Sequence, residues 1–102
     1  MGRYTMKVKK VLTPKLDDCK ARNKQYPKTF LLPSLRQLNS LKVGDHAKVI
    51  APGERFWVII RSRKGNDFVG EVNNYLIGDL HNLKKGDWIA FKRDNICNIG
   101  GG

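Results

Sequence analysis

One stretch near the middle of the chain restricts the fold more than any other. Residues 55–63 enclose a continuous run of aromatic and β-branched side chains at residues 56–60, which is typical of a strand that is covered on both faces or curled into a barrel. A Lys-Gly-Asn turn at residues 64–66 follows, and residues 67–73 return as the partner strand. Gly70 in this partner strand indicates a bulge or a sharp bend. The chain is therefore expected to build its core around a β-hairpin.

The N-terminal third predicts one strand and one short helix. Apolar and polar residues alternate along residues 4–9, as in an edge strand with one face on the core and its lysines toward water, and we predict that this strand spans residues 4–12. Thr13 followed by Pro14 predicts a helix start, because the hydroxyl can cap free N–H groups and proline is tolerated in the first turn. This helix should end before Tyr26, since the proline after it disfavours the α conformation.

A second helix is predicted from residue 35 to about residue 41. Ser34 and Gln37 have the spacing of a capping box, in which each side chain bonds the backbone amide of the other residue. Leucines at every third position would place one apolar stripe of this helix against the core. These leucines are Leu35, Leu38 and Leu41.

A five-residue pattern, Leu-Lys-x-Gly-Asp, occurs at residues 41–45 and again at residues 83–87. Each copy directly precedes an apolar run, which predicts strands at residues 46–51 and 88–92. The glycine can adopt a positive φ angle, and the aspartate can bond its own backbone. We interpret the pattern as one kind of turn that is used twice rather than as a duplication.

Residues from about 17 to 96 carry a series of motifs. The series comprises Phe30 with Pro33 and Ser34, Gly44-Asp45 followed by Lys48 and Val49, Gly-Glu-Arg-Phe-Trp-Val at residues 53–58, Gly70 with Asn73, and Leu83, Gly86-Asp87 and Phe91. In the order and spacing of these motifs the chain resembles the YegJ-like domain of unknown function found in many bacteria. The resemblance implies a small, curved antiparallel sheet with one or two short helices, and it implies no known activity. The basic N-terminal strand and the excess lysine depart from the family pattern.

With a length of 102 residues, the chain is expected to form one α+β domain. We expect a strongly bent antiparallel sheet of about four or five strands, which forms a small SH3-like or partly open β-barrel with two short helices packed on it. Residues 1–28 would supply the basic N-terminal strand and helix, residues 29–96 the barrel core, and residues 97–102 a flexible glycine-rich tail.

The balance of charges points toward an anionic partner. Twenty Lys and Arg against nine Asp and Glu give a formal net charge of +11, and residues 1–28 alone carry nine basic and two acidic side chains. Such a surplus attracts polyanions over about a Debye length, although basic surfaces also serve solubility. We therefore expect a sequence-tolerant nucleic-acid-binding module that holds DNA or RNA by its phosphates. The alternative is an adaptor or inhibitor that binds an acidic protein surface, with the strand of residues 4–8 available for strand addition.

The residues expected to hold a nucleic acid lie in three groups. They are Lys7, Lys9 and Lys10 near the N-terminus, Arg55, Trp57, Arg61, Arg63 and Lys64 in the hairpin, and Lys84 and Lys85 before the last strand. In a regular strand Arg61 and Arg63 share one face with Trp57, where an exposed ring could stack on bases. Trp57 is either such a platform or a core residue under the helices, and burial is the commoner fate of large aromatics. Tyr75 likewise could stack on a base or plug the end of the barrel, and we favour the plug.

The sequence carries no recognisable motif for catalysis or for binding a metal or cofactor. His46, His81, Cys19 and Cys97 are scattered singly, so neither a zinc site nor a cysteine nucleophile is expected. Two cysteines without close spacing are expected to stay free and reduced. There is no glycine-rich phosphate loop or clear carboxylate pair, so we expect neither an enzyme nor a small-molecule substrate. Without a long apolar run or a secretion signal, we expect a cytoplasmic protein with no membrane partner.

Overall fold

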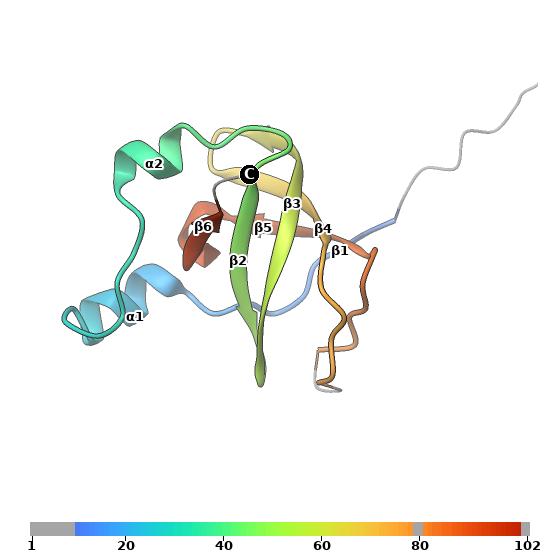
Figure 1. Ribbon diagram of the computed structural model, residues 1–102, viewed down its shortest axis with the longest axis horizontal. Coiled ribbons are helices and arrows are strands. Elements are labelled where there is room, and N and C mark those ends of the chain that lie inside the picture. The colour runs from blue at the N-terminus through green and yellow to red at the C-terminus, as the bar shows by residue number, and fades with distance from the viewer. Residues whose placement is uncertain (1–9, 79–80, 101–102) are drawn as a thin grey trace, which may run out of the picture.

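The computed structural model describes residues 10–78 and 81–100. Within these residues six strands form one sheet in the order β1-β5-β4-β3-β2-β6, with two α-helices and one 3-10 turn, η1 (Figure 1). The strands are β1 (Val11–Leu12), β2 (His46–Ala51), β3 (Glu54–Lys64), β4 (Asp67–Val72), β5 (Trp88–Lys92) and β6 (Asn98–Gly100). The helices are α1 (Cys19–Gln25) and α2 (Leu35–Asn39), and η1 spans Arg93–Asn95. The chain is thus of the α+β class, as the sequence predicts.

The predicted hairpin is the centre of the sheet. β3 pairs antiparallel with β4 through a turn at Gly65, whose φ angle of +62° favours glycine, and β3 also pairs antiparallel with β2. The pairing of β3 with β4 shifts register between Ile60 and Ser62, opposite Gly70. The irregularity expected at Gly70 is therefore present, but the extra residue, Arg61, belongs to β3. A β-bulge of this kind bends the strand and increases its twist.

The main core lies on one face of the bent sheet. Alternate residues of β3, starting with Phe56 and Val58, are buried on that face, as the pleat of a strand requires. Phe68 of β4 stacks on Phe91 of β5, with ring centroids 5.3 Å apart and planes 8° from parallel. A Cβ atom added to Gly70 would lie 2.9 Å from Cε1 of Phe91. Close packing, rather than a positive φ angle, therefore explains the glycine in β4.

The two Leu-Lys-x-Gly-Asp sequences form the same turn. In the first turn the amide of Lys42 donates to Oδ2 of Asp45 over 3.0 Å, and Gly44 has a φ angle of +97°. In the second turn the amide of Lys84 donates to Oδ2 of Asp87 over 3.1 Å, and the glycine has a φ angle of +95°. Both leading leucines are buried, and each turn exchanges two backbone bonds with a neighbouring strand. The interpretation of one turn used twice is confirmed.

The start of α2 is predicted correctly from the sequence. The amide of Gln37 donates to Oγ of Ser34 over 3.1 Å, and the amide of Ser34 donates to Oε1 of Gln37 over 2.9 Å, so the capping box is present. The helix ends at Asn39, which is earlier than expected. Leu38 is buried, but Leu35 is 64% exposed. The leucine stripe therefore meets the core over only part of its length.

α1 does not begin at the Thr-Pro pair of residues 13–14, as predicted. Its N-cap is Asp18, whose side chain accepts a hydrogen bond from the amide of Ala21 over 2.9 Å. The residues before α1 follow the sheet instead, and the amide of Asp17 donates to the carbonyl of Ile50 in β2 over 2.8 Å. This tertiary bond explains why the chain stays extended until the aspartate caps the helix. The end of α1, before the Tyr-Pro pair, is as expected.

Both edges of the sheet differ from the prediction. β1 pairs with β5 in parallel, so the sheet is mixed rather than wholly antiparallel; of the predicted strand 4–12, residues 4–9 lie outside the described part. β6 comes from residues 97–102, which were expected to form a flexible tail. Ile99 explains this difference, because it pairs with Ala47 of β2 and packs against the core. In the described residues β1 and β6 do not pair with each other, so the sheet is not closed.

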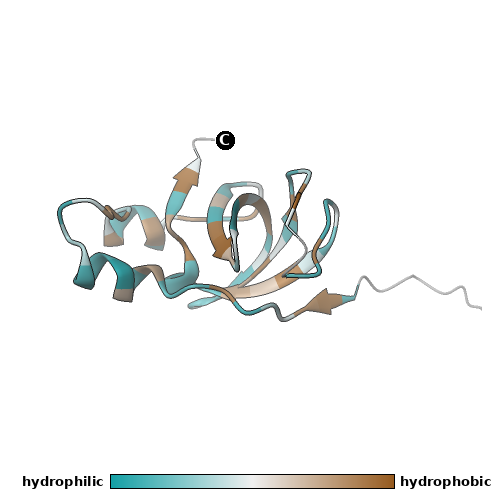
Figure 2. Ribbon diagram, turned by 90° about the horizontal axis from the view of Figure 1, so that it is seen from below, coloured by the Kyte–Doolittle hydropathy of each residue, from teal (hydrophilic) through white to brown (hydrophobic). Residues whose placement is uncertain are grey.

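Both helices lie at the β6 end of the sheet, and β1 lies at its far side (Figures 1 and 2). A second, small apolar cluster lies where α1 meets the sheet. It contains Cys19, Ile50 and Cys97, with Phe30 and Leu32 packed against it. The helices therefore form a group beside the sheet rather than a layer across the outer face of β3.

Candidate functional site

The β-bulge in β3 separates two arginines that the sequence placed on one face. After the bulge Arg63 pairs with Phe68, which is buried in the core, and paired residues in an antiparallel sheet share a face. Arg61 instead bonds Glu71, which alternates with buried residues of β4 and so lies on the outer face. The prediction that both arginines emerge beside Trp57 is wrong, because the extra residue of the bulge resets the alternation.

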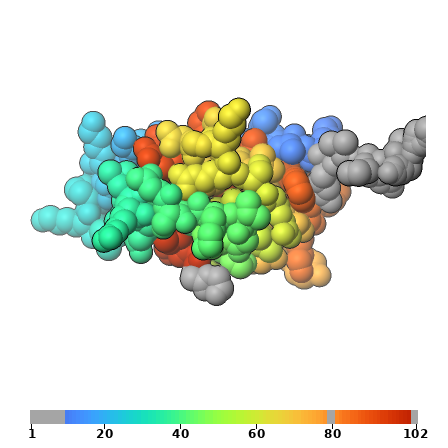
Figure 3. Space-filling view, turned by 90° about the horizontal axis from the view of Figure 1, so that it is seen from above, coloured from blue at the N-terminus to red at the C-terminus, as the bar shows by residue number. Residues whose placement is uncertain are grey.

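Arg63 is a structural residue. Its Nη1 atom donates to three carbonyls at distances of 2.8 to 3.1 Å, those of Leu38, Asn39 and Leu41. These carbonyls lie at the end of α2 and just after it, where a cation is favoured. Nε donates to the carbonyl of Gly65 over 2.9 Å. In Figure 3 the green surface of α2 adjoins the yellow surface of the β3–β4 turn. The hydrogen bonds of Arg63 connect these two segments.

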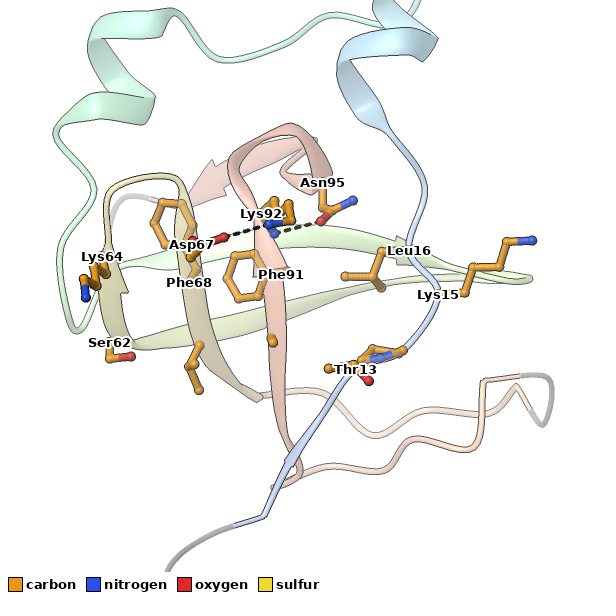
Figure 4. A pocket seen from close by; sticks show the side chains of 13 residues that line it. Thr13, Lys15, Leu16, Ser62, Lys64, Asp67, Phe68, Phe91, Lys92 and Asn95 are labelled. Carbon is orange, nitrogen blue, oxygen red and sulfur yellow. Dashed lines mark hydrogen bonds and ion pairs between the residues drawn. The ribbon is translucent and has the colours of Figure 1, made fainter.

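The other two expected cations in the second half of β3, Arg61 in the bulge and Lys64 at the end of the strand, differ in their surroundings. Arg61 forms an ion pair with Glu71, with Nη2 2.8 Å from Oε1. Lys64 is exposed and lines a cavity of about 650 Å³ between the chain before α1 and strands β4 and β5 (Figure 4). In the same cavity Lys92 pairs with Asp67, with Nζ 2.9 Å from Oδ1. This end of the hairpin therefore carries partly neutralised charge.

Trp57 lies on the outer face of β3 and is half-buried. Nζ of Lys48, its cross-strand partner in β2, is 5.3 Å from the ring centre, which is a cation–π contact. A Cβ atom added to Gly100 would lie 3.3 Å from the ring, so β6 packs closely against it. Arg55 precedes Trp57 on the same face and is exposed. Trp57 is thus an outer-face residue that is partly covered by β6 and not by a helix.

Tyr75 is 83% exposed, so it does not plug the end of the barrel as the sequence favoured. Nζ of Lys85 lies 4.3 Å from the centre of its ring. The residues before Tyr75 are bonded to β3: the amide of Trp57 donates to Oδ1 of Asn74, and the amide of Asn73 donates to the carbonyl of Trp57 over 2.9 Å. Trp57 and Tyr75 therefore lie at the same end of the sheet.

A carboxylate and a buried histidine fasten the loop between β4 and β5 to the start of β3. Oε1 of Glu54 is 2.7 Å from Nε2 of His81, and the two carboxylate oxygens accept from the amides of Gly78 and Ile77 over 2.8 and 3.1 Å. Nδ1 of His81 accepts from the amide of Leu83, so Nε2 carries the proton that is donated. The bond from His81 and then those from the amides lower the pKa of Glu54. The glutamate of the Gly-Glu-Arg-Phe-Trp-Val motif is therefore a loop clamp.

The candidate site is the group of side chains at this end of the sheet, named here the Trp57–Tyr75 surface. It consists of Lys48, Arg55, Trp57, Tyr75 and Lys85, and the exposed Lys84 lies next to it. Of the residues expected from the sequence, the fold brings Arg55, Trp57, Lys84 and Lys85 to this end. It does not bring Lys64 there, because Lys64 is at the other end of β3, about 30 Å away along an extended strand.

Two members of the surface, Lys48 and Tyr75, were not among the expected site residues. The register of the β2–β3 hairpin contains the signal for Lys48, because the Pro-Gly turn at residues 52–53 places it opposite Trp57. Nothing comparable in the sequence indicates that Tyr75 is exposed. Of the expected N-terminal lysines, Lys10 is exposed beside β1, whereas residues 7 and 9, Lys7 and Lys9, lie outside the described part.

No group of three or more His, Cys, Asp or Glu side chains in residues 10–78 and 81–100 is placed to hold a metal ion. In the same parts of the chain, neither helix has the length and apolar character needed to cross a bilayer.

Compared with protein-family models, curated proteins and solved structures, the chain matches none. The resemblance to the YegJ-like domain therefore rests on the sequence motifs alone and stays a prediction.

Proposed function

We propose that the chain is a nucleic-acid-binding module that holds a single strand of DNA or RNA on the Trp57–Tyr75 surface, with little preference for sequence. One observation carries this proposal: two aromatic rings at one end of the sheet each have a lysine Nζ over them, at 5.3 Å for Trp57 and 4.3 Å for Tyr75. Proteins that bind single strands without sequence preference combine stacking platforms with cations that follow the backbone. The scaffold that we infer for this surface is an SH3-like, partly open barrel.

The chemistry of the surface fits this ligand. A base can stack on the exposed ring of Tyr75, and such a contact contributes about 1–3 kcal/mol per base. Among the described residues, Lys48, Arg55 and Lys85 form no ion pair with a carboxylate. A phosphate can therefore bind these cations without breaking an existing pair. The net charge of +11 adds a long-range attraction for the backbone.

The cavity beside Lys64 suits a single strand less well. Its aromatic residues, Phe68 and Phe91, are buried in the core and offer no open ring for a base. Lys92 in the same cavity is already paired with Asp67. Of the two ends of the sheet, we therefore assign binding to the end that carries Trp57 and Tyr75.

Fluorescence anisotropy with labelled DNA and RNA, single-stranded and duplex, tests the proposal at two salt concentrations. We expect single strands to bind more tightly than duplexes. Affinity should fall steeply as salt rises, because each phosphate neutralised on a single strand contributes about −0.7 to the slope of log K against log salt. An affinity that does not change with salt would rule out binding through phosphates.

A matched pair of tyrosine variants tests the site. Tyr75→Ala removes an exposed ring and should weaken binding to single strands about tenfold or more. The control is Tyr26→Ala, which removes a 55% exposed ring that follows α1 and should leave the affinity unchanged. Equal effects of the two substitutions would show that Tyr75 is not a stacking platform.

A second candidate function, binding an acidic protein, is supported by a different surface. A groove of about 590 Å³ lies between the helices and η1, and Leu31 and Leu35, which line it, are 71% and 64% exposed. Exposed apolar side chains beside a groove are typical of protein interaction sites. Lys20 and Arg93 line the same groove against a single acid, Asp94. The partner would therefore present apolar side chains together with carboxylates.

Affinity capture before and after nuclease treatment separates the two functions. Loss of all captured partners after nuclease supports nucleic-acid binding, whereas acidic proteins that remain support the groove. The double substitution Leu31→Ser and Leu35→Ser should then abolish protein capture and leave oligonucleotide binding intact. Tyr75→Ala should weaken oligonucleotide binding and leave protein capture intact.

A further inference from the structure

The two cysteines are far apart in the sequence and come together in the fold. Cys19 is the first residue of α1, and Cys97 lies between η1 and β6. Both belong to the small apolar cluster around Ile50, where Cys19 is 0% and Cys97 is 9% exposed. Both are free thiols in the structure. The fold therefore places the two free thiols in one apolar cluster.

Hydrogen bonds on both sides hold the two thiols in place. Sγ of Cys19 lies 3.2 Å from the carbonyl oxygen of Asn95, and the side-chain amide of Asn95 donates to the carbonyl of Asp17 over 3.1 Å. The amide of Cys97 donates to the carbonyl of Lys48 over 2.8 Å. The start of α1, η1 and β2 are thus connected through the backbone next to each sulfur atom. The pair is therefore ordered by the fold before any bond between the sulfur atoms exists.

The two thiols differ in acidity. A hydrogen bond from the Cys19 thiol lowers the pKa of Cys97 to about 7, and the charges of Lys48 and Arg55 act in the same direction against the effect of burial. The pKa of Cys19 is raised, because its proton is held by Cys97 and because burial disfavours the charged form. Cys97 is therefore the nucleophile of the pair, since the thiolate is the reactive form of cysteine.

We propose that Cys19 and Cys97 are an oxidative modification site that forms a reversible disulfide when the chain meets a peroxide. The Cys97 thiol first releases its proton, and the thiolate attacks one oxygen of hydrogen peroxide. The O–O bond breaks, Cys97 becomes a sulfenic acid, and the hydroxide that leaves takes up the released proton to form water. The sulfur of Cys19 then attacks the sulfenic sulfur, the S–O bond breaks, and water leaves with the Cys19 proton. Two thiols and one peroxide give one disulfide and two waters, so the sulfur atoms lose two electrons and the peroxide oxygens gain them.

The disulfide would connect the beginning of α1 to the residue before β6. It would enclose most of the described chain in one covalent loop, and closing a loop of this length restricts the unfolded state strongly. We expect the oxidised chain to melt about 10 °C or more above the reduced chain. This inference is independent of the proposed function, because it needs neither a nucleic acid nor a protein partner.

Treatment of the folded wild-type chain with hydrogen peroxide, followed by mass spectrometry, tests the proposal. The intact mass should fall by two hydrogen atoms, digestion should yield one linked peptide that contains Cys19 and Cys97, and dithiothreitol should reverse both changes. The chain with Cys19→Ala should instead gain oxygen at Cys97, and the chain with Cys97→Ala should react slowly.

The mass measurements on the wild-type chain test the proposal even if one of these variants does not fold. Two free thiols after treatment would overturn the proposal. Oxygen added to Cys97 of the wild-type chain without a link, or a link between two chains, would overturn it as well.

Discussion

Substitution of Arg63 separates a structural role from a role in binding phosphate. Its guanidinium donates to three carbonyls at the end of α2 and to one in the β3–β4 turn, and it lies 4.8 Å from the centre of the Phe68 ring. Hydrogen bonds to a charged group contribute about 1.5–3 kcal/mol each, but water can replace the donor in part where the carbonyls are near the surface. We therefore expect Arg63→Met to lower the free energy of unfolding by about 2–3 kcal/mol in total.

Arg63→Lys is the matched variant, because it keeps the charge and replaces a planar fork of donors by one ammonium group. We expect it to lose about half as much stability as Arg63→Met. Urea denaturation followed by tryptophan fluorescence measures both losses. At temperatures where the variants are folded, their affinity for a single strand should stay within about twofold of wild type, because the donors of Arg63 are already occupied. Unchanged stability together with weakened binding would refute this account and make Arg63 a phosphate ligand.

Three further predictions follow from the packing, the loop clamp and the helix cap. Gly70→Ala should lower the free energy of unfolding, measured in urea, by about 1–3 kcal/mol, because the new methyl group meets Phe91. Adding Phe91→Leu to the same chain should recover part of this loss. If the losses of the two single variants simply add in the double variant, the contact is contradicted. The lowered pKa of Glu54 means that its stabilising effect is complete above the ordinary value of 4.5 and is lost as the pH falls through the folded value. Glu54→Gln should therefore flatten the dependence of Tm on pH in acid, and parallel curves would disprove the clamp. Ser34→Ala should cost about 1 kcal/mol by removing the cap of α2, and Ser34→Thr should retain most of the stability in the same assay.

Features that depend on local chemistry are predicted well from the sequence. The hairpin, the capping box at Ser34 and the two Gly-Asp turns each depend on a few neighbouring residues. In each turn the aspartate accepts a hydrogen bond from the lysine amide three residues before it, and the glycine supplies the positive φ angle. The physical cause of each pattern lies within a few neighbouring residues, so its structure depends little on the rest of the chain.

Features that depend on distant parts of the chain could not be predicted. α1 begins later than predicted because the amide of Asp17 donates to a carbonyl of β2. β6 forms because Ile99 pairs with Ala47 and packs against the core. The meeting of Cys19 and Cys97 likewise requires the assembled fold. The spacing of residues along the sequence does not indicate any of these contacts.

The candidate site shows how one local irregularity limits prediction. Alternation along β3 correctly separates Trp57 from Phe56, because the strand is regular up to Ile60. Beyond that point the bulge reverses the faces, so Arg63 turns to the core side and bonds α2. The sequence indicated an irregularity at Gly70 in β4, whereas the extra residue, Arg61, lies in β3. Because of this position, Arg61 faces solvent and Arg63 faces the core side.

We propose that the cations near two aromatic rings, and not the overall surplus of charge, hold a nucleic acid. Two double variants with the same change of net charge test it directly: Arg55→Gln with Lys85→Gln on the Trp57–Tyr75 surface, and Lys28→Gln with Lys64→Gln at exposed positions elsewhere. The measurement is the slope of log K against log salt for one single-stranded oligonucleotide. We predict that the first variant flattens the slope by about 1.4 and the second leaves it nearly unchanged. Equal slopes for the two variants would contradict the claim and assign binding to diffuse positive charge.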